Sequence, residues 1–138
     1  MMLSGKKQTS ERIVLKSLKS LQKSISKNPI SLVKQSVVNS TPVFKINKQS
    51  KKRGKKKTVK EIPIFMRNDY IRIISSLKFL VSSPKKKKEY YNFYKQLSKE
   101  ILFSSSFKSN SSSISKKADI QKQVLAQKRY LFNFRWKG

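Results

Sequence analysis

The sequence predicts a mainly α-helical fold, a helical bundle of about five helices with a protruding two-stranded β-ribbon between the second and third helices. Three observations indicate this. Apolar residues recur at helical spacing along most of the 138 residues, the period becomes strand-like between residues 43 and 65, and the same segment holds a dense run of positive charge. We expect a single domain, residues 1–138, with the ribbon as its arm.

Two helices precede the arm. The first is expected over residues 9–27, because its apolar residues recur every three or four positions among lysines and serines. Asn28 and Pro29 are typical of an N-cap and a first helical residue, which predicts a second helix over 29–40. Pro42 disfavours helical backbone in the residue before it and therefore ends that helix.

The arm, residues 43–65, is predicted from a change of period. Phe44 and Ile46 alternate with their neighbours, which is typical of a strand, and residues 58–65 favour a second strand. Gly54 lies in the basic turn between the two. A lone two-stranded ribbon is marginally stable, so we expect it to pack on helices at its base and on a partner at its tip.

Two further helices follow the arm. The first of them is expected to begin at Asn68 and Asp69. A stripe at helical spacing is its predicted core face: Tyr70, Ile74, Leu77 and Val81. Ser83 with Pro84 repeats the cap-and-proline pattern and predicts the start of the fourth helix. Its predicted core face comprises Tyr90, Tyr94, Leu97 and Ile101.

The C-terminal region begins with a serine-rich segment. Residues 104–115 are expected to form a poorly ordered, low-complexity loop. Ser115 is the expected N-cap of a last helix that runs to about Phe132, with Ile120, Val124 and Leu131 facing inward. An aromatic and basic tail then closes the chain.

Charge is the strongest functional signal. The chain has 34 lysines and arginines against 6 aspartates and glutamates, a net charge of +28. Self-repulsion of this size opposes a compact state, and salt screens it only partly, because the Debye length in physiological salt is about 8 Å. We therefore expect a polyanionic partner. Nucleic acid is the first hypothesis and an anionic membrane surface the second.

Residues 45–60 concentrate that charge, with nine positive side chains and no carboxylate. Lysines and arginines held out on an arm neutralise phosphates, release counterions and enter a nucleic-acid groove or cleft. The alternative is a solvated loop or a localisation tag. The position of the run between two β-favouring segments favours the arm.

Several classes of chemistry are not supported. The chain has no cysteine and no histidine, which excludes disulfides, thiolate chemistry and ordinary zinc sites. No two of its six acids are closer than eight positions, and nothing favours paired-carboxylate catalysis. No apolar run approaches the roughly 18 residues of a membrane span. We expect no enzyme activity, no cofactor, no metal and no small-molecule substrate.

Two other patterns leave alternatives open. Lys116–Lys117 and Lys85–Lys88 are each expected in a first helical turn, where a bound phosphate would offset the unfavourable macrodipole; the alternative is a solvated basic face. The aromatic residues from Tyr90 to Tyr94 are interpreted as core rather than as a base-stacking platform. The aromatic residues of the tail suit RNA contact as well as packing.

Four short motifs occur in a specific order. SGKKQ (4–8) is similar to a Gly-Lys-Lys turn, NPISLVKQSVVNSTPVFKIN (28–47) to a proline-headed helix and strand, KKRGKKKTVKEIPIF (51–65) to a basic glycine turn and a Val-Pro strand, and QKRYLFNFRW (127–136) to a basic aromatic close. Together, over nearly the whole chain, they resemble the universal small-subunit ribosomal protein seven family.

The resemblance implies a structural constituent of the small ribosomal subunit. Such a protein binds the 3′ major (head) domain of small-subunit rRNA, supports head assembly beside neighbouring head proteins, and sends its ribbon toward the exit-site tRNA and the mRNA exit path. The implied ribbon contacts to rRNA are Lys45, Lys48, Lys51, Lys52, Arg53, Lys55, Lys56, Lys57 and Lys60. Those from helices and tail are Arg67, Arg72, Lys116, Lys117, Lys128, Arg129, Arg135 and Trp136.

The chain also departs from the family pattern. Most of the family's first helix is missing, and the ribbon turn has one glycine where two are usual. Lys52 replaces an arginine, which favours bulk charge over planar recognition. The helix after the ribbon has Lys78-Phe79 in place of Arg-Trp, and a serine-rich loop replaces a glycine-rich basic one.

The scarcity of alanine and glycine beside abundant lysine, isoleucine and asparagine indicates an A+T-rich coding genome, as organelles often have. Divergence from the family pattern favours a mitochondrion over a plastid. The competing hypotheses are a general nucleic-acid-packing protein of an organelle and, with less support, a peripheral membrane protein that uses residues 9–27. That segment also has features of an import sequence, but its lysine bias favours its retention in the mature fold.

Overall fold

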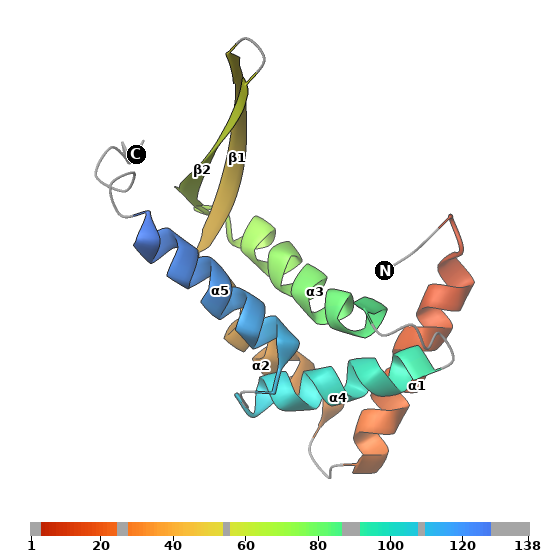
Figure 1. Cartoon of the computed structure of the whole chain (residues 1–138). Coiled ribbons are helices and arrows are strands. Elements are labelled where there is room, and N and C mark those ends of the chain that lie inside the picture. The colour runs from red at the N-terminus through yellow and green to blue at the C-terminus, as the bar shows by residue number, and fades with distance from the viewer. Residues whose placement is uncertain (1–3, 25–27, 54–55, 87–91, 108–109, 128–138) are drawn as a thin grey trace.

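The computed structural model describes residues 4–24, 28–53, 56–86, 92–107 and 110–127 (Figure 1). Within them lie five helices and one antiparallel pair of strands, placed between the second and third helices as the sequence predicts. The mainly helical fold class is confirmed. The elements in chain order are α1 (Lys7–Ser24), α2 (Pro29–Ser40), β1 (Phe44–Arg53), β2 (Lys56–Phe65), α3 (Asp69–Lys86), α4 (Phe93–Ser105) and α5 (Ser112–Ala126).

Helix α4 is central to the bundle and packs against each of the other four helices. Its buried residues Leu97 and Ile101 form the main apolar cluster with Leu21 of α1, which is fully buried. Phe93, at the start of α4, packs against the same cluster. The predicted core face of the fourth helix is thus confirmed at its two C-terminal positions, whereas Tyr90 lies outside the described residues.

Serines rather than large apolar residues fill the junction of α2, α3 and α4. Ser36, Ser40, Ser76 and Ser104 are each 0% exposed. The hydroxyl of Ser76 donates to the carbonyl of Val37 at 2.9 Å, and that of Ser104 donates to the carbonyl of Ser36 at 3.2 Å. Small side chains let the helices approach closely, and each buried hydroxyl has a partner, as burial of a polar group requires.

The orientation of α3 differs from the prediction. Two residues of the expected inward stripe are outside, because Tyr70 is 70% exposed and Leu77 is 43% exposed, while Ile74 and Val81 are half-buried. The helix instead buries Ser76, Leu80 and Pro84. Helical spacing identified an apolar stripe, but the side that α3 buries is the neighbouring one, on which the hydroxyl of Ser76 hydrogen-bonds to α2.

The expected start of the fourth helix was wrong. Pro84 lies in the last turn of α3, with its ring buried, and α4 begins only at Phe93. Lys85 and Lys86 therefore belong to the C-terminal end of α3, where the helix dipole favours cations, and not to a first turn. The other two lysines of that run, Lys87 and Lys88, lie outside the described residues.

The serine-rich segment is shorter as a loop than expected. Helix α4 continues to Ser105, and the N-cap of α5 is Ser111 rather than Ser115. The reason is Glu100 of α4, which is 6% exposed. Its Oε1 accepts hydrogen bonds from the hydroxyl of Ser111 at 2.9 Å and from the backbone N–H of Ser113 at 2.9 Å. A buried carboxylate thus fixes the first turn of α5, where negative charge is favourable.

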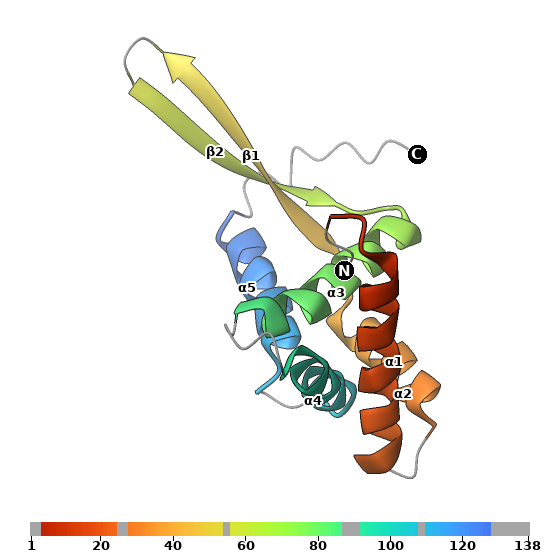
Figure 2. The ribbon, with the colours of Figure 1, turned by 90° about the vertical axis from the view of Figure 1, so that its right-hand side faces the viewer.

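The ribbon projects from the helices as a narrow arm (Figures 1 and 2). At its base the rings of Phe44 and Phe65 meet edge to face, with centroids 5.9 Å apart. The backbone N–H of Met66 donates to the carbonyl of Val43 at 3.0 Å, which closes the base, and Pro63 is fully buried. Strand β1 also contacts α5. The base is therefore anchored in the body while the strands extend away from it.

Candidate nucleic-acid interface

The register of the ribbon brings positive residues together. Strands β1 and β2 pair over ten residues each, from Phe44 opposite Phe65 to Arg53 opposite Lys56. Near the tip Lys52 pairs with Lys57. Like charges directly opposite each other in a ladder are destabilising, and an anion bound to both residues of such a pair would remove that cost. The predicted ribbon contacts therefore lie on one continuous arm, except Lys55, which is outside the described residues.

The lower half of the ribbon carries exposed cations. Lys45 and Lys60 are exposed, and Lys48 forms an ion pair with Glu61 at 2.9 Å. The Lys48 side chain keeps 70% of its surface exposed, so the pair is a surface salt bridge of about 0–1 kcal/mol. Lys48 is consequently available to a phosphate only in competition with one carboxylate.

The two predicted arginines after the ribbon occupy different places. Arg67 lies in the exposed link to α3. Arg72 is on α3 itself, and its Nη1 donates to Oδ1 of Asp69 at 3.0 Å. The side chain of Arg72 is 29% exposed, and its Nε is buried without a hydrogen-bond partner. Arg72 thus presents only part of its guanidinium to solvent.

Lys116 and Lys117 are engaged within the protein. Lys117 Nζ donates to the backbone carbonyl of Asn39, at the C-terminal end of α2, at 2.8 Å, and Lys116 Nζ donates to the hydroxyl of Ser82 on α3. Burial, and secondly the nearby charge of Arg72, lower the pKa of Lys117. Both lysines therefore tie α5 to α2 and α3, and neither lies in the first helical turn predicted for it, because α5 begins at Ser112.

The remaining predicted contacts, Lys128, Arg129, Arg135 and Trp136, lie outside the described residues.

A basic stripe on α1 was missed by the sequence analysis. Arg12, Lys16, Lys19 and Lys23 are all exposed. Their spacing of four, three and four residues places them on one side of the helix. The same periodicity that locates apolar faces would have found it, had it been applied to cations.

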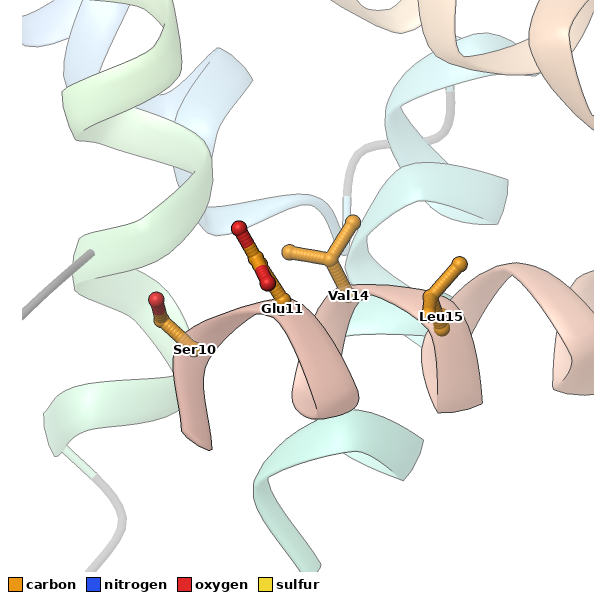
Figure 3. Close-up of a pocket in the computed structure, with 4 residues that line it drawn as sticks. All are labelled: Ser10, Glu11, Val14 and Leu15. Atoms are coloured by element: carbon orange, nitrogen blue, oxygen red, sulfur yellow. The ribbon is translucent and has the colours of Figure 1, made fainter. Parts of the chain in front are cut away.

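A pocket of about 440 Å³ lies beside α1, lined by Ser10, Glu11, Val14 and Leu15 (Figure 3). Its carboxylate is exposed and lies 3.8 Å from Lys7 Nζ. Across the described residues no three acidic, cysteine or histidine side chains gather as a metal site would require. None of the described helices is long and apolar enough to cross a membrane. Among the described residues, the candidate binding surfaces are therefore the basic arm and the α1 stripe, where positive side chains gather.

Comparison with known proteins decides the family. The sequence profile described as "Ribosomal protein S7p/S5e" matches residues 1–128. The chain belongs to this family. The resemblance seen in four short motifs is therefore confirmed.

Two relatives of this S7p/S5e chain carry the names of organellar small-subunit proteins. The chain is 30% identical over 118 residues to "Small ribosomal subunit protein uS7c" of Euglena longa. The matched region covers 86% of this chain and 62% of that protein. The chain is 26% identical over 136 residues to "Small ribosomal subunit protein uS7m" of Reclinomonas americana, covering 99% of this chain and 80% of the relative. The chain thus spans less than two thirds of the length of the Euglena longa protein.

Proposed function

We propose that this chain is a structural, non-enzymatic constituent of an organellar small ribosomal subunit, where it binds the 3′ major (head) domain of the rRNA. The observation that carries the proposal is the arm: a two-stranded ribbon projects from the helical body, and its register pairs Lys52 with Lys57 and Arg53 with Lys56 near the tip (Figure 1). Family membership supports the ribosome as the particle, and the net charge of +28 supports RNA as the partner.

Parts of the surface have distinct roles in this proposal. The ribbon carries the outer contacts and extends toward the exit-site tRNA and the mRNA exit path. The α1 stripe contacts rRNA from the body, and neighbouring head proteins complete the surroundings. Lys116 and Lys117, which bond to Ser82 and Asn39, contribute by holding α5 in place.

The proposed location is the mitochondrion, with the plastid as the alternative. Relatives named uS7m and uS7c support an organellar ribosome. The divergence of the sequence from the family pattern favours the mitochondrion.

The test is salt-dependent binding to a head-domain rRNA transcript. We expect the triple replacement of Lys51, Lys52 and Arg53 by Gln to flatten the slope of log affinity against log salt by about 0.7–0.9 for each phosphate that the variant no longer neutralises. The matched control replaces Lys95, Lys99 and Lys122, exposed lysines of α4 and α5, by Gln and should leave the slope nearly unchanged. Equal slopes for the two variants would remove the arm from the binding surface.

Two further measurements separate this proposal from a general packing protein. A packing protein binds duplex DNA and rRNA alike, whereas the ribosomal proposal predicts preference for one folded RNA domain. In a high-salt gradient of organelle lysate the chain should sediment with the small subunit. Its absence from that peak would overturn the ribosomal proposal.

A further inference from the structure

Helix α3 leaves an apolar stripe uncovered. Tyr70 is 70% exposed, Ile73 is 45% exposed and Leu77 is 43% exposed. Ile74 and Val81 are half-buried and extend the same side of the helix. These five residues, hereafter the α3 stripe, span about three turns at spacings of three and four, so they form one continuous apolar surface.

Polar contacts on the other side of α3 keep the stripe outside. The hydroxyl of Ser76 donates to the carbonyl of Val37 at 2.9 Å and lies 2.8 Å from the hydroxyl of Ser40. Turning α3 to bury Leu77 would break both contacts, and a hydrogen bond of this kind contributes about 0.5–1.5 kcal/mol to stability. The fold is therefore not free to cover the stripe by rotating this helix.

We propose that the α3 stripe is the docking surface for a neighbouring protein that presents an amphipathic helix with carboxylates beside its apolar ridge. Apolar stripes of this kind accept helices through anchors at i, i+3, i+4 and i+7. Exposed apolar patches rimmed by polar residues mark interaction sites. The proposal rests on the proposed function in one respect, that the partner belongs to the same subunit.

Charge complementarity selects the acidic partner. Lys78, the residue after Leu77 on α3, is exposed. The one carboxylate of α3, Asp69, is paired with Arg72 at 3.0 Å. The rim of the stripe is therefore positive, and carboxylates on the partner are attracted to it. A second copy of this chain would bring another net charge of +28 against the first and is disfavoured.

RNA and lipid fit the stripe less well. Isoleucine and leucine offer a phosphate no hydrogen bond, and only Tyr70 has a ring on which a base stacks. A helix that lies in a membrane interface keeps its opposite, polar face in water. The opposite face of α3 is instead packed against α2, α4 and α5. A folded protein partner is the occupant that matches both the apolar chemistry and the fixed geometry.

The test places a photoreactive benzoylphenylalanine at position 77 of an affinity-tagged full-length chain expressed in its organelle. After irradiation, the chain is recovered by its tag and the cross-linked fragment is sequenced by mass spectrometry. We expect one segment of another protein, with apolar residues at helical spacing and more aspartate and glutamate than lysine and arginine. The same group at Val38, which is 70% exposed on α2, is the control and should not yield that segment.

Several outcomes would overturn the docking proposal: a cross-link to rRNA, to lipid, to a second copy or to another part of this chain, or no product above the Val38 control. Because the cross-linked chain is recovered by its tag, its partner can be identified whether or not the chain is part of the small subunit. If the chain does not sediment with the small subunit, the proposed function fails, while the cross-linked fragment still decides whether the stripe binds an acidic helix.

Substitution gives a second measurement. The double variant Ile73→Glu, Leu77→Glu should reduce recovery of the cross-linked protein by about tenfold or more, as removal of an interface anchor does. Its affinity for the head-domain transcript should stay within about twofold. Val38→Glu should change neither quantity. A Tm that falls far more for the double variant than for Val38→Glu would show that this chain covers the stripe itself and would overturn the proposal.

Discussion

Lys117 shows how a single residue in a cationic protein can be structural. Its ammonium group satisfies the carbonyl of Asn39 at the end of α2, 2.8 Å away, yet it is held close enough to Arg72 to be destabilised by that charge. The family resemblance implied an RNA contact for Lys117. No local pattern in the sequence shows that α5 packs beside the end of α2, because that contact depends on how distant segments pack.

The lowered pKa of Lys117 predicts a pH dependence of stability. Between that lowered pKa and 10.5, its value in an unfolded chain, the unfolded state binds more protons than the folded state. The free energy of unfolding therefore rises with pH across this window. We expect denaturant unfolding to show a smaller rise for Lys117→Met than for Lys122→Met, which removes an exposed lysine of the same helix. Identical pH profiles would contradict the assignment.

Glu100 is the residue on which the start of α5 depends. Its Oε1 also accepts from the hydroxyl of Ser113 at 2.7 Å, in addition to Ser111 and the N–H of Ser113. Glu100→Ala removes the acceptor from buried donors and should lower the free energy of unfolding by about 3 kcal/mol. Glu11→Ala, which removes an exposed pair with Lys7, should cost at most about 0.5 kcal/mol. Urea titrations would measure both, and equal decreases would refute the role of Glu100.

At the scale of the element, the ribbon is an arm that depends on its base. In the described structure the ladder has no second sheet to pack on. Its base is closed by the edge-to-face contact of Phe44 with Phe65 and by the buried Pro63, and the contact of β1 with α5 connects it to the body. The presence of the ribbon and its approximate first and last residues were predictable from the sequence, because strand periodicity, a turn glycine and a change of composition coincide there.

The ribbon base gives an element-scale prediction. Phe44→Ala removes the aromatic pair and part of the apolar contact, worth about 1–3 kcal/mol together. Amide hydrogen exchange should accelerate by about tenfold or more in β1 and β2 while the helices keep their protection. Val59→Ala, at a position 54% exposed on β2, is the control and should have little effect. Uniform acceleration over the whole chain would show that the ribbon is not a separate unit.

Helix termini were less predictable than helices. Ser83 with Pro84 has the same local pattern as Asn28 with Pro29, yet only Asn28 caps a helix, its side chain accepting from the N–H of Ile30 at 3.0 Å. The ring of Pro84 is buried and the helix ends two residues later, so tertiary packing overrides the local signal. Likewise, Ser111 rather than Ser115 begins α5, because Glu100 lies next to it in space.

For the whole molecule, repulsion among like charges is the dominant liability. A net charge of +28 on 138 residues opposes the folded state, and a small apolar cluster with buried serines holds it together. Assembly with a polyanion turns the same charges into binding energy.

Salt should therefore act with opposite signs on the free and the bound protein. Raising salt shortens the Debye length from about 10 Å at 0.1 M to about 3 Å at 1 M, which screens repulsion and should raise the Tm of the isolated chain. In complex with the head-domain transcript the same change weakens phosphate contacts and should lower the Tm. Scanning calorimetry of both samples would test this, and a Tm that falls with salt in the isolated chain would contradict it.

The sequence by itself determined the helical class, the place of the ribbon and the charge that demands a polyanionic partner, because periodicity, turn residues and net charge are local or additive properties. Only the tertiary structure decided which side of α3 is buried, where α5 begins and which lysines remain exposed. Those outcomes depend on hydrogen bonds between residues far apart in the chain, such as Ser76 with Val37 and Lys117 with Asn39, which no local pattern encodes.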